Sequence, residues 1–354
     1  MSATVRIGVI GTGWWATQHH LPSLLETPGV ELAGIADADP ERLARAADRF
    51  GVARRFGDAA ELLAEPALDG VMIATPHHTH HALARMALEA GVATFVEKPL
   101  ALEPAHAWEL VALAEARGLP LVVGYTLQHT RSAQRLRELV QGGELGELLT
   151  VAGVSTTILS SYFGGTPDDY AEAFGFAVTG PLPSTYSDPA RAGGGQAATQ
   201  LTHSAAMVCH VTGRGPAEVH AKLRRAGLAV DLADALLFEL RDGAAGSLVS
   251  AGVARPGQRP QQDLWYHGSD GYAVQRMVDG TVDVHWADGR HERVAPAAGE
   301  PAVPDRAPAA RFAAIVRGEA DSPVAPACAA HAVELVSAAY ASAAAGAPVR
   351  VAAR

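Results

Sequence analysis

A glycine-rich turn close to the N-terminus most constrains how this chain folds. Residues 5–10 form a short apolar run typical of a buried strand, a turn with the sequence GTGWWA follows at 11–16, and a helical stretch begins near residue 18. In such a turn the first glycine, Gly11, allows a tight bend, and the second, Gly13, lets a ligand approach the backbone. The small Ala16 permits close packing of the helix on the strand. The turn therefore predicts a dinucleotide-binding βαβ unit with phosphate groups at the helix N-terminus.

An acidic residue beyond this turn fits the same ligand. Asp37 ends a second strand-like run at 30–36, somewhat further along the chain than the roughly 20 residues usual for this motif. A carboxylate there accepts hydrogen bonds from the adenosine ribose and repels a 2′-phosphate. Ala38 follows, and no arginine stands between Asp37 and Arg42. The predicted cofactor is therefore NAD rather than NADP.

The first third of the chain alternates strand-like and helix-like segments. Such alternation predicts a parallel sheet built from βαβ units, which is a doubly wound Rossmann domain over residues 1–124. Asp39 followed by Pro40 is typical of a helix start, and Thr79 is expected to cap a later helix. The strand-like runs are 5–10, 30–36, 68–73, 94–96 and 120–123, and the helix-like runs are 18–25, a run from 39, 79–90 and 104–117.

The pattern changes after Gly124, where β-branched runs with few intervening helices dominate. This favours a second domain over residues 125–354, of α+β type with a mostly antiparallel sheet flanked by helices. The expected strands are 149–157, 218–222, 235–240, 246–252, 263–268 and 282–286, and the expected helices are 132–141, 202–211, 311–316 and 331–345.

Composition excludes several classes of function. The chain has 354 residues and a formal net charge of −10, which disfavours nucleic-acid binding. No run approaches the roughly 20 apolar residues of a membrane-spanning helix, and the N-terminus lacks the pattern of a secretory signal. Cys209 and Cys328 have no metal-ligand spacing and are expected to be reduced. A cytoplasmic protein without membrane or nucleic-acid partners is expected.

A cluster of histidines at 77–81 raises the question of a metal site. His77 and His81 are four residues apart and could share a helix face, yet no third ligand stands nearby in a recognised spacing. We therefore expect no metal, and interpret the cluster as residues of a cofactor loop and a helix surface.

Lys98 stands at the end of a strand-like run, a position that favours a role in catalysis over a solvent-exposed charge. It follows the strand-like run 94–96, with a carboxylate before it in Glu97 and a rigid residue after it in Pro99. Because the strand belongs to the domain with the glycine-rich turn, Lys98 is expected to lie near a bound nicotinamide.

These motifs together resemble the Gfo/Idh/MocA oxidoreductases, the family of glucose–fructose and inositol dehydrogenases. The resemblance implies a Rossmann domain, an open-faced sheet domain that forms oligomer contacts in a homodimer or homotetramer, and oxidation of a secondary alcohol of a sugar, sugar derivative or cyclitol. The matching pieces, in the family's order, are 11–16, Asp37, Ala74-Thr75-Pro76 with His80, Glu97-Lys98-Pro99, and Gly193-Gly194-Gly195 followed by His203.

The resemblance also assigns residues to roles. Lys98 matches a lysine that touches both the nicotinamide region and the substrate hydroxyl, and His203 matches a histidine near the reacting carbon. The expected cofactor contacts are Gly11, Thr12, Gly13, Trp14, Trp15, Asp37, Thr75, Pro76, His77, His80, Glu97 and Lys98. The expected substrate contacts are Lys98, Tyr125, Gln128, Tyr186, Thr199, Gln200 and His203.

One departure from the family pattern affects the proton transfer. Many members carry an aspartate four residues before the histidine, where this chain has Thr199. Threonine orients a hydroxyl but cannot act as a base near neutral pH. The expected catalytic set is therefore Lys98, His203 and Thr199. His203 is the preferred base because imidazole titrates near working pH, and Lys98 holds the alkoxide or takes the proton itself.

Three functions fit these residues. The first is an NAD-dependent dehydrogenase, which run in reverse is a ketone reductase. The second is a redox-neutral enzyme that keeps NAD bound, as an epimerase or an eliminating glycosidase does. The third is an NAD-sensing regulator without catalysis, which would not need Lys98 and His203 together.

Overall fold

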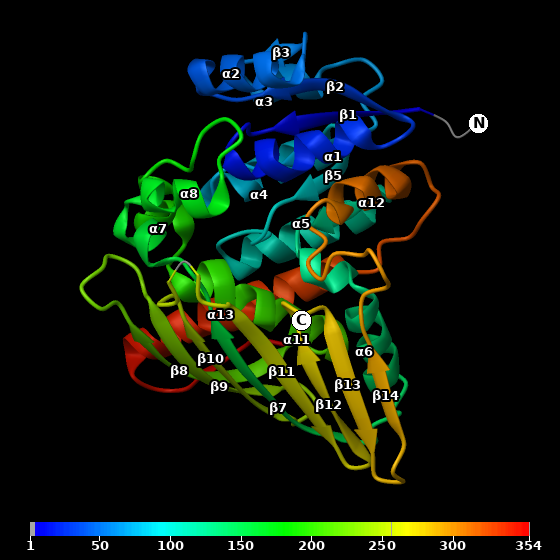
Figure 1. Ribbon diagram of the computed structural model, residues 1–354, viewed down its shortest axis with the longest axis vertical. Coiled ribbons are helices and arrows are strands. Elements are labelled where there is room, and N and C mark those ends of the chain that lie inside the picture. The colour runs from blue at the N-terminus through cyan, green and yellow to red at the C-terminus, as the bar shows by residue number, and fades with distance from the viewer. Residues whose placement is uncertain (1–3, 256, 354) are drawn as a thin grey trace.

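The computed structural model describes residues 4–255 and 257–353, and it contains two β-sheets. In Figure 1 a smaller sheet with helices around it occupies the upper part of the molecule, and a larger sheet forms the lower part. Helices lie between the two sheets. This arrangement confirms the predicted fold class, an α/β unit followed by an α+β unit.

The smaller sheet has six strands, all parallel, in the order β3-β2-β1-β4-β5-β6. The order runs outward in two directions from β1 and β4, as in a doubly wound sheet, and ligands of such sheets bind where the order reverses. Its strands are β1 (Val5–Ile10), β2 (Val30–Ala36), β3 (Arg55–Phe56), β4 (Gly70–Ile73), β5 (Ala93–Val96) and β6 (Leu121–Val123), and its helices are α1 (Leu21–Glu26), α2 (Pro40–Phe50), α3 (Ala59–Leu63), α4 (His80–Glu89) and α5 (Pro104–Arg117).

Local sequence explains how these helices begin. The side chain of Asp39 accepts hydrogen bonds from the backbone N–H groups of Glu41 and Arg42, both at 3.0 Å, which confirms the cap predicted for α2. Thr79 occupies the N-cap position of α4, as predicted, but its side chain makes no capping hydrogen bond. Its hydroxyl donates to the carbonyl of Pro76 at 2.7 Å, because a 3₁₀ turn, η2 (His77–Thr79), precedes α4. The helix after the glycine-rich turn begins as a π-helical turn, η1 (Ala16–His20), and continues as α1.

The larger sheet has nine strands in the order β14-β13-β12-β11-β7-β10-β9-β8-β15. All neighbours pair antiparallel except β7 and β10, which are parallel. The strands are β7 (Leu148–Thr156), β8 (Pro216–Arg224), β9 (Ala233–Leu240), β10 (Ala245–Ala251), β11 (Gln261–Gly268), β12 (Gly271–Arg276), β13 (Thr281–Trp286), β14 (His291–Val294) and β15 (Val349–Arg350). The β-branched runs predicted six of these strands, while β12, β14 and β15 were missed because they are short or rich in polar residues.

One face of this sheet is covered by α6 (Arg131–Gln141), α11 (Thr202–Thr212) and α13 (Pro326–Ala345). In Figure 1, α11 and α13 lie above the strands and α6 runs beside β13 and β14. The other face is open, and apolar side chains such as Leu237 (62% exposed) and Val249 (48% exposed) lie on it. The sheet therefore has the open-faced form that the family resemblance implies.

The chain returns to the first sheet near its C-terminus. Helix α12 (Ala307–Val316) packs against α1, and the ring of Phe312 lies 5.8 Å from that of Phe95 on β5. The division at residue 124 stays a prediction, with the addition that α12 rests on the N-terminal unit. Within residues 4–255 and 257–353, no helix has both the length and the apolar character needed to cross a membrane.

A long segment between β7 and α11 folds back over the glycine-rich turn. It contains five short helical pieces, and the ring of Tyr162 stacks on that of Trp14 with 6.2 Å between ring centroids. These pieces are α7 (Ser160–Gly164), η4 (Pro167–Tyr170), α8 (Ala171–Phe174), α9 (Ser184–Ser187) and α10 (Pro189–Ala192). The segment therefore closes one side of the region at the carboxyl ends of the parallel strands.

Candidate active site

A cavity of about 980 Å³ opens at the carboxyl ends of β1, β2, β4 and β5. Its walls come from the loops after these strands, from the segment between β7 and α11, and from the start of α11. This volume is near the upper end of the range for small-molecule pockets, so the cavity suits a large ligand. Of the predicted site residues, the cavity wall includes Gly11, Gly13, Trp14, Trp15, Asp37, Thr75, Pro76, His77, Glu97, Lys98, Tyr186, Gln200 and His203.

Five predicted residues lie behind this wall and do not line it. Thr12, His80, Tyr125, Gln128 and Thr199 are each at most 1% exposed. Gly124, Thr126 and Leu127 line the cavity in the stretch where Tyr125 and Gln128 were expected to do so.

The glycine-rich turn has the geometry that its sequence predicts. Gly11 adopts φ +91°, and a Cβ atom there would lie 2.5 Å from the carbonyl oxygen of Ala74. At Gly13 a Cβ atom would meet nothing within 4 Å, so the backbone faces open space in the cavity. A ligand can therefore approach the N–H groups of this turn closely.

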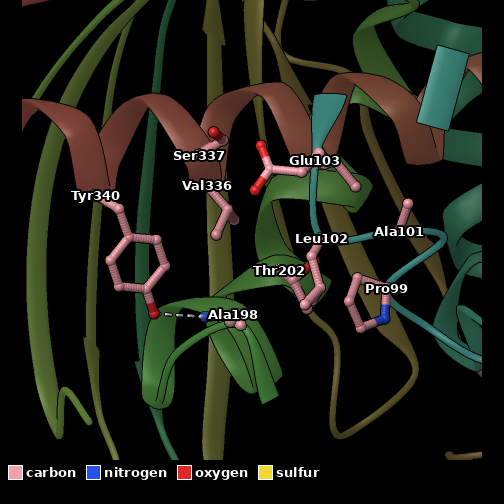
Figure 2. A pocket seen from close by; sticks show the side chains of 11 residues that line it. Pro99, Ala101, Leu102, Glu103, Ala198, Thr202, Val336, Ser337 and Tyr340 are labelled. Carbon is pink, nitrogen blue, oxygen red and sulfur yellow. Dashed lines mark hydrogen bonds between the residues drawn. The ribbon is translucent and has the colours of Figure 1, made fainter. Parts of the chain in front are cut away.

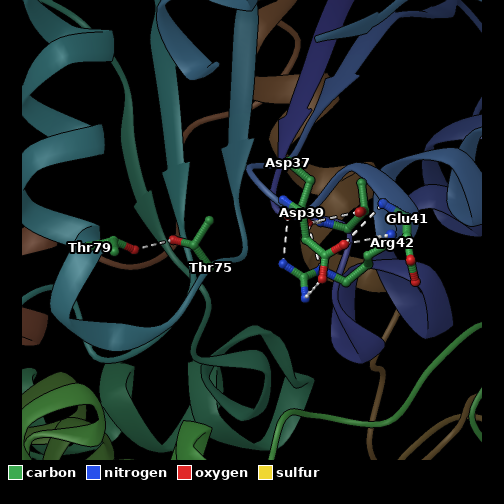
Figure 3. Close-up of polar contacts among 7 residues, drawn as sticks. Asp37, Asp39, Glu41, Arg42, Thr75 and Thr79 are labelled. Carbon is green, nitrogen blue, oxygen red and sulfur yellow. Dashed lines mark hydrogen bonds and ion pairs between the residues drawn. The ribbon is translucent and has the colours of Figure 1, made fainter. Parts of the chain in front are cut away.

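Asp37 is held by more donors than its sequence position suggested (Figure 3). Its carboxylate accepts hydrogen bonds from the backbone and hydroxyl of Thr12 at 2.8 and 2.9 Å. Arg42 adds a bidentate pair, with Nε at 2.9 Å and Nη2 at 2.6 Å. Burial alone would raise the pKa of Asp37, but the hydrogen bonds from Arg42, Asp39 and Thr12 outweigh it and lower the pKa. The carboxylate is therefore ionised, and Arg42 is a site residue that the sequence interpretation missed.

The loop after β4 is fixed by hydrogen bonds within the loop and to the loop after β5. The hydroxyls of Thr75 and Thr79 lie 2.7 Å apart (Figure 3). The His80 ring lies between the carbonyls of Pro99 and Thr75, at 2.7 and 2.9 Å. His80 thus ties the loop after β4 to the loop after β5, a positioning role instead of the cofactor contact expected for it.

His77 joins this loop to the second half of the chain. Its Nδ1 lies 2.9 Å from the carbonyl oxygen of Ala192 on α10. Burial and then the neighbouring His80 and Lys98 lower the pKa of His77 to about 3. The ring is therefore neutral and donates from Nδ1 to that carbonyl.

Glu97 is a buried carboxylate at the end of β5 that anchors the residues around Lys98. It accepts hydrogen bonds from Trp15 Nε1 at 2.9 Å and from the Lys98 backbone at 3.2 Å, and His20 Nε2 lies 2.8 Å away. Burial would raise the pKa of Glu97, but the hydrogen bond from His20 and the charges of His20 and Lys98 lower it. The glycine-rich turn and the lysine loop are thereby fixed relative to each other.

Lys98 and His203 both face the cavity from opposite units of the structure. Lys98 Nζ donates to the backbone carbonyl of Thr199 at 2.9 Å, and burial lowers the pKa of Lys98 although Glu97 opposes the shift. Burial and then the Lys98 charge place the pKa of His203 well below 6.5. His203 is therefore a neutral imidazole beside a cation.

Thr199 contributes in a different way from the one expected. Its hydroxyl donates to the Gly195 carbonyl at 2.7 Å and its side chain is fully buried. The part of Thr199 that reaches Lys98 is the backbone carbonyl, so the residue orients the lysine instead of facing a substrate.

A buried carboxylate, which the motifs did not reveal, supports the start of the His203 helix. Asp231 accepts hydrogen bonds from the backbone N–H groups of Gly195 at 2.8 Å and Ala197 at 2.7 Å. Tyr340 on α13 donates its hydroxyl to Asp231 at 2.6 Å. The same hydroxyl accepts from the N–H of Ala198 at 3.3 Å (Figure 2). The hollow in Figure 2 has a volume of about 160 Å³, too small for a dinucleotide.

Further cavity residues come from parts of the chain without a recognisable motif. Asp305 precedes α12, and burial and then the Glu97 charge raise the pKa of its carboxyl. Arg191 lies on α10, and Tyr162 and Phe174 add aromatic surface. Only the tertiary fold brings Asp305, Arg191 and Phe174 to the wall, so local sequence carried no signal for these three. Among the described residues, no group of three or more His, Cys, Asp or Glu side chains is placed to hold a metal ion.

Comparison with protein families identifies this architecture. Residues 5–125 match the model described as an oxidoreductase family with an NAD-binding Rossmann fold, and residues 133–274 match the GFO/IDH/MocA C-terminal domain. The chain belongs to the Gfo/Idh/MocA family. Both halves thus confirm the resemblance that the sequence motifs carried, including the NAD-binding character of the first domain.

Curated relatives match over less than half of the chain. D-apiose dehydrogenase of Paraburkholderia graminis is 36% identical over 138 residues, which is 39% of this chain and 36% of that protein. Inositol 2-dehydrogenase 3 of Saccharopolyspora erythraea is 36% identical over 146 residues, which is 40% of this chain and 42% of that protein. The matched part thus spans less than half the length of these relatives.

Two solved structures match over almost the whole chain. GenD2 from gentamicin A biosynthesis, solved in complex with NAD, has a TM-score of 0.79 and 25% identity, and the match covers 100% of this chain and 98% of that one. Levoglucosan dehydrogenase, solved with NADH and L-sorbose, has a TM-score of 0.81 and 23% identity, covering 99% and 100%. The second likeness shows a shared fold.

Proposed function

We propose that this protein is an NAD-dependent dehydrogenase of a sugar, sugar derivative or cyclitol. It oxidises a secondary hydroxyl, or reduces the matching ketone in the reverse direction. The observation that carries the proposal is that Lys98 and His203 line one cavity together with the glycine-rich turn. Two curated relatives are named as dehydrogenases of D-apiose and of inositol, and these names support the same class of substrate.

The residues at the N-terminal end of the cavity fit NAD. The backbone at Gly11 and Gly13 leaves room for the pyrophosphate, and Asp37 stands where the adenosine ribose would lie. Thr75, Pro76 and His77 would flank the nicotinamide end, near Glu97 and Lys98. When bound, NAD supplies the hydride acceptor for alcohol oxidation.

Lys98 is the better candidate for the group that accepts the hydroxyl proton. Burial lowers the pKa of Lys98 from 10.5 towards working pH, so its amine can accept a proton there. The pKa of His203 is lowered well below 6.5, so its imidazole is a weak base. This reverses the ranking that the sequence favoured. Neutral His203 would hydrogen-bond the reacting hydroxyl and orient it, and the carbonyl of Thr199 would aim Lys98. Gln200 and Tyr186 would contact other substrate hydroxyls.

A spectrophotometric screen tests this function. The purified protein with NAD and a panel of pentoses, hexoses, uronic acids and inositols is expected to produce NADH, seen at 340 nm, with at least one member of the panel. Absence of NADH with every member, while NAD stays bound through purification and a substrate is converted, would instead favour the redox-neutral reaction.

Asp37 is expected to set the preference for NAD. Removing it in Asp37→Ala abolishes the repulsion of a 2′-phosphate and frees Arg42, which now pairs with the carboxylate at 2.6 Å. A charge-assisted pair with the phosphate would raise the ratio of kcat/KM for NADP to that for NAD by about ten- to a hundredfold. The double variant Asp37→Ala/Arg42→Ala is the control and should lose most of this gain. An unchanged ratio in the single variant, or equal use of both cofactors by the unmodified protein, contradicts the assignment.

The open face of the nine-stranded sheet supports an oligomer, and we propose a homodimer or homotetramer formed through it. Leu237 and Val249 lie on neighbouring strands of this face and are exposed. Leu237→Glu places a charge on this face and is expected to lower the molar mass measured by light scattering to that of a smaller assembly. Leu25→Glu, at an exposed leucine of α1, is the matched control. A monomeric unmodified protein contradicts the proposal.

A further inference from the structure

Arg191 is a cation in the cavity wall that has no carboxylate partner among the described residues. Its Nε atom is shut off from solvent without a hydrogen-bond partner, and the residue lines the cavity. The two other arginine and lysine side chains of the wall are already engaged. Arg42 pairs with Asp37, and Lys98 donates to the Thr199 carbonyl beside Glu97. Arg191 therefore retains hydrogen-bonding capacity that a ligand can use.

The surroundings hold Arg191 in place. The N-terminus of α10 is capped by Asp188, whose carboxylate accepts from the Ala190 backbone at 2.9 Å. The carbonyl of the next residue, Ala192, accepts a hydrogen bond from His77 of the loop after β4, and Ala192 is fully buried. The backbone of Arg191 is thus fixed beside the loop after β4, and among the described residues no carboxylate neutralises its guanidinium.

The location favours a substrate group over the cofactor phosphates. The pyrophosphate has its own donors in the backbone of the glycine-rich turn and the helix that follows it. Arg191 instead belongs to the continuous stretch that carries Tyr186 and, twelve residues further on, His203. The rings of Tyr162 and Tyr186, which lie 5.4 Å apart, face the same cavity and offer apolar surface to a sugar ring.

We propose that Arg191 binds a carboxylate of the substrate, so that the enzyme acts on an acidic sugar such as a uronic or aldonic acid. This rests on the proposed dehydrogenase function. A guanidinium matches a carboxylate with two parallel hydrogen bonds. One guanidinium balances one negative charge, whereas a phosphate carries nearly two, and the carboxylates of Glu97 and Asp305 in the same wall oppose a second negative charge.

Paired ligands that differ only in the acid group test this proposal. D-glucuronate against D-glucose, D-galacturonate against D-galactose, and D-gluconate against D-glucitol are titrated into the complex with NADH, and binding is followed by calorimetry. At least one acid is expected to bind about tenfold or more tightly than its neutral partner. Arg191→Gln should remove this preference and Arg191→Lys should keep part of it. Arg42→Gln makes the same charge change at the ribose end of the cavity and should leave the acid-to-neutral ratio unchanged.

Each other outcome separates the inference from the proposed function. No preference for any acid in the unmodified protein, or a preference that survives in Arg191→Gln, overturns the inference. An equal loss of NADH affinity and acid affinity in Arg191→Gln also overturns it, because Arg191 would then bind a cofactor phosphate. Failure of the unmodified protein to bind NADH would overturn the proposed function itself, whereas oxidation of neutral sugars without acid preference would overturn only the role of Arg191.

Discussion

Replacement of Lys98 by methionine is expected to lower kcat for alcohol oxidation by about a hundred- to ten-thousandfold. The change keeps the length of the side chain but removes the amine that accepts the proton and stabilises the alkoxide, and general acid–base catalysis has this magnitude. Steady-state NADH production at saturating substrate measures it. Lys98 and Lys222 are the two lysines of the chain, so Lys222→Met on β8 is a matched control and should keep full activity.

The pH profile distinguishes a chemical role of Lys98 from a structural one. Burial lowers the pKa of Lys98, so kcat/KM for oxidation is expected to rise with pH through a midpoint below 10.5. This ionisation should persist in His203→Asn, which loses less activity, and should vanish in Lys98→Met. Turnover in Lys98→Met equal to that of the unmodified protein sinks the mechanism. An ionisation that is absent in His203→Asn would make His203 the base.

Some of this site could be predicted from local sequence and some could not. The glycine-rich turn, Asp37 and the Glu97-Lys98-Pro99 element were recognisable because each lies at the end of a parallel strand, where a short motif fixes its own geometry. Five of the six strands of the first sheet were predicted, because buried parallel strands are continuous apolar runs, and only the two-residue β3 was missed.

The parts that escaped prediction depend on contacts between distant segments. Arg42 turns back onto Asp37 only because α2 starts at Pro40, and Asp305 reaches the wall only because α12 returns to the first sheet. Thr199 was expected to show its hydroxyl to the cavity, since it stands four residues before His203. The π-helical turn η5 (Ala197–Leu201) and the hydrogen bond to Gly195 bury that hydroxyl.

The buried pair Asp231 and Asp234 links the stability of the protein to pH. Burial and then the neighbouring Asp231 carboxylate raise the pKa of Asp234 to about 9. The folded protein therefore keeps a proton that the unfolded chain releases above about pH 4. Since the folded state binds more protons, the free energy of unfolding contributed by this group falls as pH rises from about 4 towards 9.

Asp234→Asn removes this dependence by replacing the protonated acid with a neutral amide of similar shape. The free energy of unfolding of the variant minus that of the unmodified protein is expected to increase by about 2 kcal/mol between pH 7 and pH 8.5. This corresponds to about 1.4 kcal/mol per pH unit. Urea denaturation at the two pH values measures it, and taking the difference between variant and unmodified protein cancels the other titrating groups. Asp263→Asn, at a less buried aspartate of β11, is the control and should show no growing difference. A constant difference for Asp234→Asn would mean that Asp234 is ionised in the folded protein. Asp231, which accepts hydrogen bonds from the backbone of Gly195 and Ala197, would then lie beside an ionised, buried Asp234 carboxylate.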